Sequence, residues 1–287
     1  MTTVLTAARK RFHDALVENH TLTLSPSRVA SNADNGQKSS VAIAREIALD
    51  LSAQTVEKKL QGQRAGRQFE QAVEGFVKDT FPHLHSLRPG DWTIYNVGGS
   101  RKEYQVAKYE PYAHLADLAR AIESDRTLAS VLGNSYEISP DILVVRSPEP
   151  DHVINRDQEI VDSDFGIYAS LRKGNQKRAI VHAIISCKWT LRSDRAQNAR
   201  SEALNVIRNR KGRMPHTVVV TGEPSPSRLA SLALGTGDID MVYHFALPEL
   251  IDAVEGTEND EAISMLRTLI DGKRIRDITD LPLDLAV

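Results

Sequence analysis

Ser186, Lys188 and Glu202 bring a hydroxyl, an ammonium and a carboxylate into one short stretch, Val181–Glu202. The stretch begins with an apolar run that predicts a buried strand, in which Ser186 and Lys188 share one face while Cys187 faces the core. A lysine at the end of a buried strand loses solvation unless an anion or a metal-bound group meets it. The spacing therefore indicates a site for a charged ligand at the end of this strand.

Two carboxylates can reach the same place. A helix is predicted from Ser193, and Glu202 lies about two and a half turns along it, which can carry its carboxylate back towards the strand end. Asp141 immediately precedes another apolar run, 142–145, and an acid at the edge of a buried strand needs a partner. We therefore group Asp141 with Lys188 and Glu202.

This set of residues predicts phosphodiester hydrolysis. The reaction needs a more acidic attacking water, neutralised charge at phosphorus and a stabilised leaving oxygen, and Mg²⁺ held by oxygen ligands can supply all three. Asp141 and Glu202 are the expected ligands, and the backbone carbonyl of Cys187 completes the inner coordination. Lys188 would lie against the scissile phosphate or orient the water. Mn²⁺ fits the same oxygen ligands.

Charge is unevenly distributed along the chain. The segment 172–213 contains twelve Lys or Arg residues and two acids, whereas the remaining chain carries 24 basic against 36 acidic residues. Such an asymmetry favours one positive surface on an acidic body, as expected for a polyanionic partner. A basic helix that merely faces solvent would show the same charge.

Taken together, PD at 140–141, SCK at 186–188 and Glu202 resemble the permuted form of the PD…(D/E)xK nuclease signature. In this form a serine, here Ser186, occupies the usual acid position, and the missing acid comes from the next helix. The variant is typical of restriction endonucleases that recognise a CCGG core, and the RSDR tract at 192–195 resembles the segment with which these enzymes read it. The resemblance extends over the whole chain in length and element order. It implies a restriction-endonuclease-like fold and one or two Mg²⁺ ions per active site.

The RSDR tract has a physical interpretation that agrees with this resemblance. In the major groove an arginine pairs bidentately with guanine O6 and N7, and an aspartate accepts from cytosine N4. Arg192 and Arg195 would then read the two guanines, while Asp194 bridges the adjacent cytosines. Judged alone, Asp194 could equally be an acid that favours the dipole at the start of a helix.

The resemblance implies further roles that no short motif fixes. Glu70 matches an acid on an N-terminal helix beside the active site, Asp34 and Arg228 match readers of an outer G·C pair, and Gln63 lies on the minor-groove side. The implied substrate is double-stranded DNA with the palindrome GCCGGC, cut before the first C of the CCGG core to leave 5′ CCGG overhangs. Type IIF members act as homotetramers, dimers of dimers. Reading a palindrome with one constellation per half-site itself requires a two-fold dimer.

Apolar periodicity predicts an α/β chain whose mixed central sheet is flanked by helices on both faces. We expect a single domain, 1–287, with an N-terminal helical part over about 1–90 and a catalytic core over about 91–287. A polar loop is expected at 31–40 and a Gly-Gly turn at 98–99. Helices are predicted over 1–20, 41–52, 66–81, 112–124, 193–202 and beyond, 226–234, 247–254 and 259–271, and strands over 92–97, 142–145, 181–188, 216–222 and 240–246.

Composition and missing motifs exclude several classes of protein. The chain has one cysteine, so it holds no internal disulfide and no cysteine-rich zinc site. It contains no HExxH, P-loop or GxGxxG motif, so a metalloprotease, an NTPase and a Rossmann enzyme have no support and no nucleotide cofactor is expected. We found neither a secretory leader nor a membrane-spanning run, and therefore expect a cytoplasmic protein with no membrane partner.

Two other functions compete with a sequence-specific endonuclease. A structure-specific or repair nuclease on the same core would need Asp141, Lys188 and Glu202 but not the RSDR tract. A DNA-binding regulator would need the tract but not the other three residues. The chain contains both sets, which favours a sequence-specific endonuclease.

Overall fold

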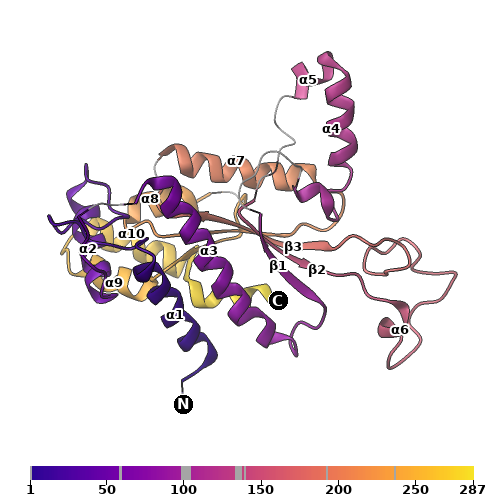
Figure 1. Cartoon of the computed structure of the whole chain (residues 1–287), viewed down its shortest axis with the longest axis horizontal. Helices are drawn as coiled ribbons and strands as arrows, with labels where there is room; N and C mark the ends of the chain where they lie inside the picture. Colours follow the sequence, from indigo (N-terminus) through magenta and orange to yellow (C-terminus); the bar gives the residue numbers. More distant parts are fainter. Residues whose placement is uncertain are drawn as a thin grey trace.

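A six-stranded sheet forms the centre of the molecule, with its strands in the order β1-β2-β3-β4-β5-β6 (Figure 1). The computed structural model describes residues 2–57, 60–97, 105–132, 138, 140–191, 193–235 and 237–287, without the side chains of 105, 126, 129, 132 and 193–195. Neighbouring pairs among β1, β2 and β3 are antiparallel, and those from β3 to β6 are parallel. The expected mixed sheet is therefore confirmed. The strands are β1 Trp92–Asn96, β2 Ile142–Arg146, β3 Ile180–Lys188, β4 His216–Thr221, β5 Met241–His244 and β6 Ile275–Asp277.

Helices flank this sheet. The α-helices are α1 Val4–Glu18, α2 Lys38–Asp50, α3 Gly62–Thr80, α4 Leu115–Ser124, α5 Arg126–Leu132, α6 Asp151–Ile154, α7 Ser193–Asn209, α8 Pro226–Ala233, α9 Leu247–Glu255, α10 Asp260–Asp271 and α11 Leu281–Leu285. Three short 3₁₀ helices are η1 Phe81–Leu84, η2 Gln105–Lys108 and η3 Ile278–Asp280. Within the described residues, no helix is both long enough and apolar enough to cross a membrane.

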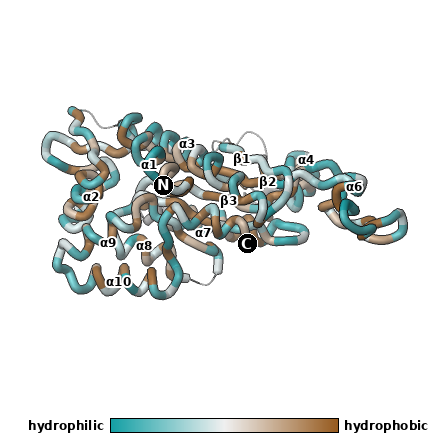
Figure 2. Tube along the Cα trace, turned by 90° about the horizontal axis from the view of Figure 1, so that it is seen from below, coloured by the Kyte–Doolittle hydropathy of each residue, from teal (hydrophilic) through white to brown (hydrophobic). Residues whose placement is uncertain are grey.

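Side-chain alternation along β3 decides which helix covers which face of the sheet. Ile184 and Ser186 line a narrow hollow together with Ala199 and Ala203 of α7. Cys187 belongs to the larger hydrophobic cluster, which includes Phe69 of α3, and its side chain is buried as predicted. Figure 1 shows α3 and α7 on either side of the strands, and in Figure 2 hydrophobic residues concentrate along the strands. The central strand is thus buried on both faces, which explains its near-continuous apolar run.

The amphipathic helices follow their predicted apolar spacing. In α1 the side chain of Thr3 accepts a hydrogen bond from Thr6 N, and Ala8, Phe12 and Leu16 are buried. Their burial at intervals of four places one face of the helix against the core. The longer α3 buries Phe69, Val73, Phe76 and Val77 in the same way and begins four residues before the predicted start at 66.

Several short elements escaped prediction, including α5, α6, β6 and α11. The strand β6 has three residues, too few for an alternation pattern, and α6 has four residues, about one turn. The short helix α11 has Pro282 in its first turn and buries Leu281 and Leu285. The predicted helix over 112–124 begins at Leu115 instead, and the predicted turn at 98–99 lies outside the described residues.

Candidate active site

The carboxyl end of β3 brings Asp141, Ser186, Lys188 and Glu202 together. Because β2 pairs antiparallel with β3 through Ile142 and Ile185, Asp141 reaches the last residues of β3. Its Oδ2 atom accepts from Cys187 N at 2.7 Å and from Lys188 Nζ at 3.3 Å. The Oε2 atom of Glu202 lies 3.7 Å from Lys188 Nζ and accepts from Ser186 Oγ at 3.3 Å. The four side chains that we grouped from the sequence therefore form one cluster.

Burial and mutual charge set the protonation of this cluster. Burial alone would lower the pKa of Lys188, but the charges of Asp141 and Glu202 outweigh it and raise that pKa. Burial raises the pKa of Glu202, with a further contribution from Asp141, against the lowering effects of Lys188 and Ser186. Lys188 thus stays an ammonium between two acids, where it can also meet a phosphate.

Glu70 belongs to the same electrostatic environment. Burial raises its pKa to about 7, the charge of Asp141 adds to the rise, and Lys188 and Arg67 oppose it. The helix α3 positions this carboxylate because Phe69, the preceding residue, is fully buried and stacks obliquely against Trp189 at 5.0 Å between ring centroids. Glu70 is half-buried beside the Asp141 and Lys188 pair.

The donor atoms of this cluster fit a hard divalent cation. Asp141 and Glu202 offer carboxylate oxygens, the ligand type that Mg²⁺ and Mn²⁺ prefer. Within the part of the chain that the structure describes, no three His, Cys, Asp or Glu side chains converge to hold a metal ion. Our predicted ligand set contains two side chains and a backbone carbonyl, that of Cys187, so a cation there would depend on the main chain for its third protein ligand.

The predicted base-reading tract begins just beyond β3. Arg192 lies outside the described residues, and the side chains of Asp194 and Arg195 are likewise not described. The backbone of both residues lies in the first turn of α7, as predicted from a helix start at Ser193. The residues predicted for cleavage and those predicted for base reading are therefore a few positions apart, at the end of β3 and the start of α7.

Two residues expected to read the outer base pair meet although they are far apart in the sequence. Arg228 Nη2 donates to Asp34 Oδ2, and Asp34 also accepts from Gly36 N at 3.0 Å. Both line a groove of about 320 Å³, together with Ser31, Asn32, Ala33, Leu60, Gly62, Ala65, Trp189 and Thr190. Gln63 is exposed in the first turn of α3, next to Gly62 of this groove. The structure thus brings the outer-pair residues to the edge of the sheet where β3 ends.

Sequence reasoning missed one buried acid, Glu223, in the loop that follows β4. Its side chain is fully buried, and Oε2 accepts from Leu191 N at 2.7 Å while Oε1 accepts from Ser225 N at 3.2 Å. Oε2 also lies 3.8 Å from Arg228 Nη1. The signal that could have found it is the one used for Asp141, an acid directly beside a buried strand.

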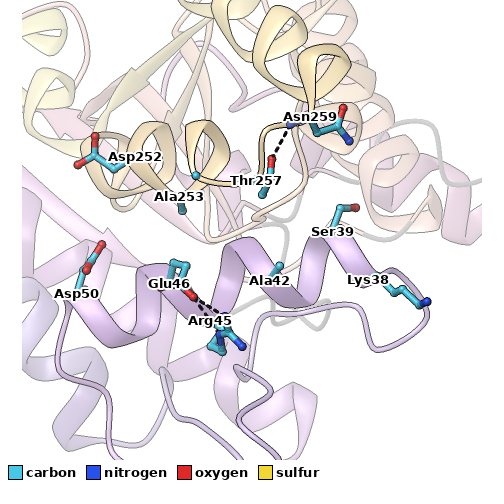
Figure 3. Close-up of a pocket in the computed structure, with 11 residues that line it drawn as sticks. Lys38, Ser39, Ala42, Arg45, Glu46, Asp50, Asp252, Ala253, Thr257 and Asn259 are labelled. Atoms are coloured by element: carbon cyan, nitrogen blue, oxygen red, sulfur yellow. Dashed lines mark hydrogen bonds and ion pairs between the residues drawn. The ribbon is translucent and has the colours of Figure 1, made fainter.

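Another groove lies away from this site. A hollow of about 560 Å³ lies between α2 and α9 (Figure 3). Both basic and acidic side chains line it, among them Lys38, Arg45, Glu46, Asp50 and Asp252. Arg45 and Glu46 pair with each other at 2.7 Å. None of the residues predicted for catalysis or base reading lines this groove.

Comparisons with known proteins show the family of this chain. Residues 12–287 match the family model described as NgoMIV restriction enzyme. The chain is 49% identical over 287 residues to the type II restriction enzyme NgoMIV of Neisseria gonorrhoeae, and the match covers 100% of both chains. The chain belongs to the NgoMIV restriction enzyme family, and its activity is that of a type II site-specific deoxyribonuclease. The expected fold class and the expected enzyme class are therefore confirmed.

Replacing Glu223 by glutamine tests whether burial raises the pKa of the Glu223 carboxyl group. Burial raises its pKa to about 7, partly opposed by the N–H of Leu191 and by Arg228. Because the folded chain holds this proton more tightly than the unfolded chain does, Glu223 favours folding at low pH, and that contribution is lost as the pH rises from about 4.5 to about 7. Relative to the parent, Glu223→Gln should gain about 1–3 kcal/mol in free energy of unfolding between pH 5 and pH 8. Urea unfolding at both pH values measures this difference.

Glu18→Gln is the matched control, because Glu18 is exposed at the end of α1. It should shift the free energy of unfolding equally at the two pH values. An equal shift for Glu223→Gln would contradict the raised pKa.

Proposed function

We propose that this enzyme cleaves double-stranded DNA at the palindrome GCCGGC, before the first C of the CCGG core, and leaves 5′ CCGG overhangs. The observation that carries the proposal is the contact of Lys188 with both Asp141 and Glu202 at the end of β3, directly before the RSDR tract. The family supports sequence-specific DNA cleavage, and type II restriction enzymes generally depend on a divalent metal. We propose Mg²⁺, one or two ions per active site, with Mn²⁺ as a substitute.

The residues of the cluster have distinct roles in this proposal. Asp141, Glu202 and the Cys187 carbonyl hold the cation, which when bound makes water more acidic and neutralises charge on the phosphate. Ser186 donates its hydroxyl hydrogen to Glu202 and thereby orients that carboxylate. Lys188 presents its ammonium to the scissile phosphate or to the attacking water. Glu70 adds an acid beside this set.

Base reading is assigned to residues that lie near the edge of the sheet where β3 ends. Arg192, Asp194 and Arg195 read the CCGG core in the major groove, as the donor and acceptor pattern of these side chains allows. Arg228 and Asp34 read the outer G·C pair, and their ion pair in the groove supports a shared role. Gln63 contacts the minor-groove side.

We propose a homotetramer, a dimer of dimers, in which each dimer reads one palindrome. Its support is the segment 155–178, which follows α6, extends away from the sheet (Figure 1) and exposes hydrophobic side chains, among them Ile160 and Ile167. Phe165 is 76% exposed and Tyr168 is 92% exposed. Arg172, itself buried, fixes the segment through Asp151 and through the carbonyls of Phe165 and Asp162. An ordered segment with exposed aromatic rings is suited to a contact between subunits.

We also propose that residues 1–287 form one domain. Its N-terminal helical part, about 1–90, and its catalytic core, about 91–287, contribute to one hydrophobic cluster that runs from Ala8 to Leu285. A shared core of this kind supports a single cooperative unit.

The proposed site and cofactor are tested together with a plasmid that carries GCCGGC. We expect discrete double-strand cuts with Mg²⁺, none in excess EDTA, and recovery with Mg²⁺ or Mn²⁺, because the oxygen ligands suit either ion. Sequencing the fragment ends should give 5′ CCGG overhangs. Cuts at another sequence would contradict the proposed site, and nonspecific degradation would favour a repair-type nuclease.

Replacing Lys188 or Asp141 by alanine separates cleavage from binding. Either change should reduce the cleavage rate by roughly 10²-fold or more, because Lys188→Ala removes the ammonium aimed at the reacting phosphate and Asp141→Ala removes a proposed ligand of the cation. Binding to the cognate site without metal, measured by fluorescence anisotropy, should stay within about threefold, because neither residue is assigned to read bases. Lys10→Ala, at an exposed lysine of α1 outside the basic segment 172–213, is the control and should leave both quantities unchanged. Loss of specific binding in a folded Lys188→Ala protein would contradict the assignment.

Removing the exposed rings of the segment 155–178 tests the assembly. The parent should sediment as a tetramer, and Phe165→Ser/Tyr168→Ser should sediment as a dimer, because the change removes apolar area from the proposed contact. Leu87→Ser is the control, since Leu87 is 66% exposed elsewhere and should leave the mass unchanged. A parent that sediments as a dimer at every concentration would contradict the tetramer.

A further inference from the structure

The buried carboxylate of Glu223 lies between the two sets of proposed base-reading residues. We propose that Glu223 is a positioning residue for sequence recognition, which holds the start of the RSDR tract and the side chain of Arg228 in fixed relation. The inference rests on the base-reading roles proposed above and adds a residue to which no contact with DNA is assigned. It predicts that reading of the core and reading of the outer base pair are coupled through one side chain.

The first part of this connection is a backbone contact. Glu223 Oε2 accepts from Leu191 N at 2.7 Å, and Leu191 is the residue directly before Arg192. Leu191 is 1% exposed, so its position is also fixed by packing. A charge-assisted hydrogen bond to this N–H determines where the chain turns towards the RSDR tract.

The second part is the guanidinium of Arg228. Its Nη1 atom lies 3.8 Å from Glu223 Oε2, while its Nη2 atom donates to Asp34. The two acids therefore hold different edges of one guanidinium, and a planar fork held at two points has little rotational freedom. Because the same oxygen of Glu223 meets Leu191 N and faces Arg228, a displacement of this carboxylate changes both contacts.

The surrounding loops are packed too tightly to move independently. A Cβ atom at Gly222 would lie 2.5 Å from the ring of Trp189 and 3.0 Å from its carbonyl oxygen, so only glycine fits there. Thr221 Oγ1 donates to Lys188 O at 2.7 Å, and Asn32 Nδ2 donates to Gly222 O at 2.7 Å. The segments that carry the core readers, Arg228 and Asp34 are thus joined around Glu223.

Asp277 provides an internal comparison that separates this role from a structural one. It is the last residue of β6, and it accepts from the N–H of the first residue of α9, Leu247, at 3.0 Å. Burial opposes its ionisation, but direct hydrogen bonds from Arg9 at 3.2 Å lower its pKa, so the ionised form stabilises the fold. Arg9 is itself shared with Glu249, but it still donates two hydrogen bonds to Asp277. Arg228 instead donates to Asp34 and lies 3.8 Å from Glu223, beyond hydrogen-bond distance.

Glu223 therefore keeps a buried charge that contributes less to stability than the charge of Asp277 does. Burial raises the pKa of Glu223 to about 7, against the lowered pKa of Asp277. Buried ionisable groups with such displaced pKa values gather at functional sites. The contrast favours a role in recognition over a role in folding.

The experiment compares cleavage selectivity at each base position. The parent, Glu223→Gln, Arg228→Ala and Asp277→Asn are incubated at pH 8 with a library of random-sequence DNA and Mg²⁺, and the fragment ends are sequenced. Glutamine keeps the shape of Glu223 but cannot accept both N–H groups or attract Arg228 as a carboxylate does. We expect Glu223→Gln to lose on the order of 10-fold selectivity at both the outer and the core positions. Arg228→Ala should lose it at the outer position alone, and Asp277→Asn at neither despite a lower melting temperature.

Each outcome bears on one claim. A Glu223→Gln profile equal to that of the parent, or changed at only one of the two positions, would overturn the coupling. A parent profile other than GCCGGC contradicts the proposed site but leaves the Glu223 comparison readable on whatever site the parent selects.

If Glu223→Gln does not fold, Glu223→Asp takes its place. Aspartate keeps the charge but is shorter by one methylene, so it retreats from Leu191 N. A smaller loss of selectivity at both positions supports the role, and an unchanged profile overturns it.

Discussion

The pairing of β3 with a neighbour on each side fixes the places of Asp141 and Lys188 in the active site. Antiparallel pairing with β2 brings Asp141 to Cys187 N, and parallel pairing with β4 places Lys188 opposite Thr221. A shift of one residue in this register would turn Lys188 into the core and Cys187 towards the cluster, since side chains alternate. The pairing register of β3 thus decides which of its last residues face the cluster.

The cluster at this sheet edge contains more acidic side chains than basic ones. Glu70, Asp141 and Glu202 share Lys188, and the pKa values of Glu70 and Glu202 are raised by burial and by the charge of Asp141. Removing these groups from water is unfavourable unless a counter-charge compensates. The site is therefore electrostatically suited to a divalent cation and poorly suited to a purely structural role.

The strands from β3 to β6 are parallel, so the loops that follow them leave the sheet at the same edge. At this edge, Glu223 in the loop after β4 accepts a hydrogen bond from Leu191 N in the loop after β3. Asp277, the last residue of β6, accepts from Leu247 N in a similar way. Each acid shares its arginine with another carboxylate, but Arg9 donates to Asp277 directly, whereas Arg228 donates to Asp34 and only faces Glu223. The proposed difference between recognition and stability follows from where the arginine points.

The sequence by itself determined the local part of this protein. Apolar spacing gave β1 to β5 and the main helices, and the isolated charges beside buried strands identified Asp141, Lys188 and Glu202, because a buried charge without a partner is unfavourable wherever it lies. Only the tertiary structure decided which distant residues meet. Asp34 and Arg228 are 194 positions apart and join through loops with no periodic pattern, and Glu223 reaches Leu191 across 32 positions. Such contacts depend on strand order and loop paths, which local propensity does not encode, so the coupling around Glu223 became visible only in the folded chain.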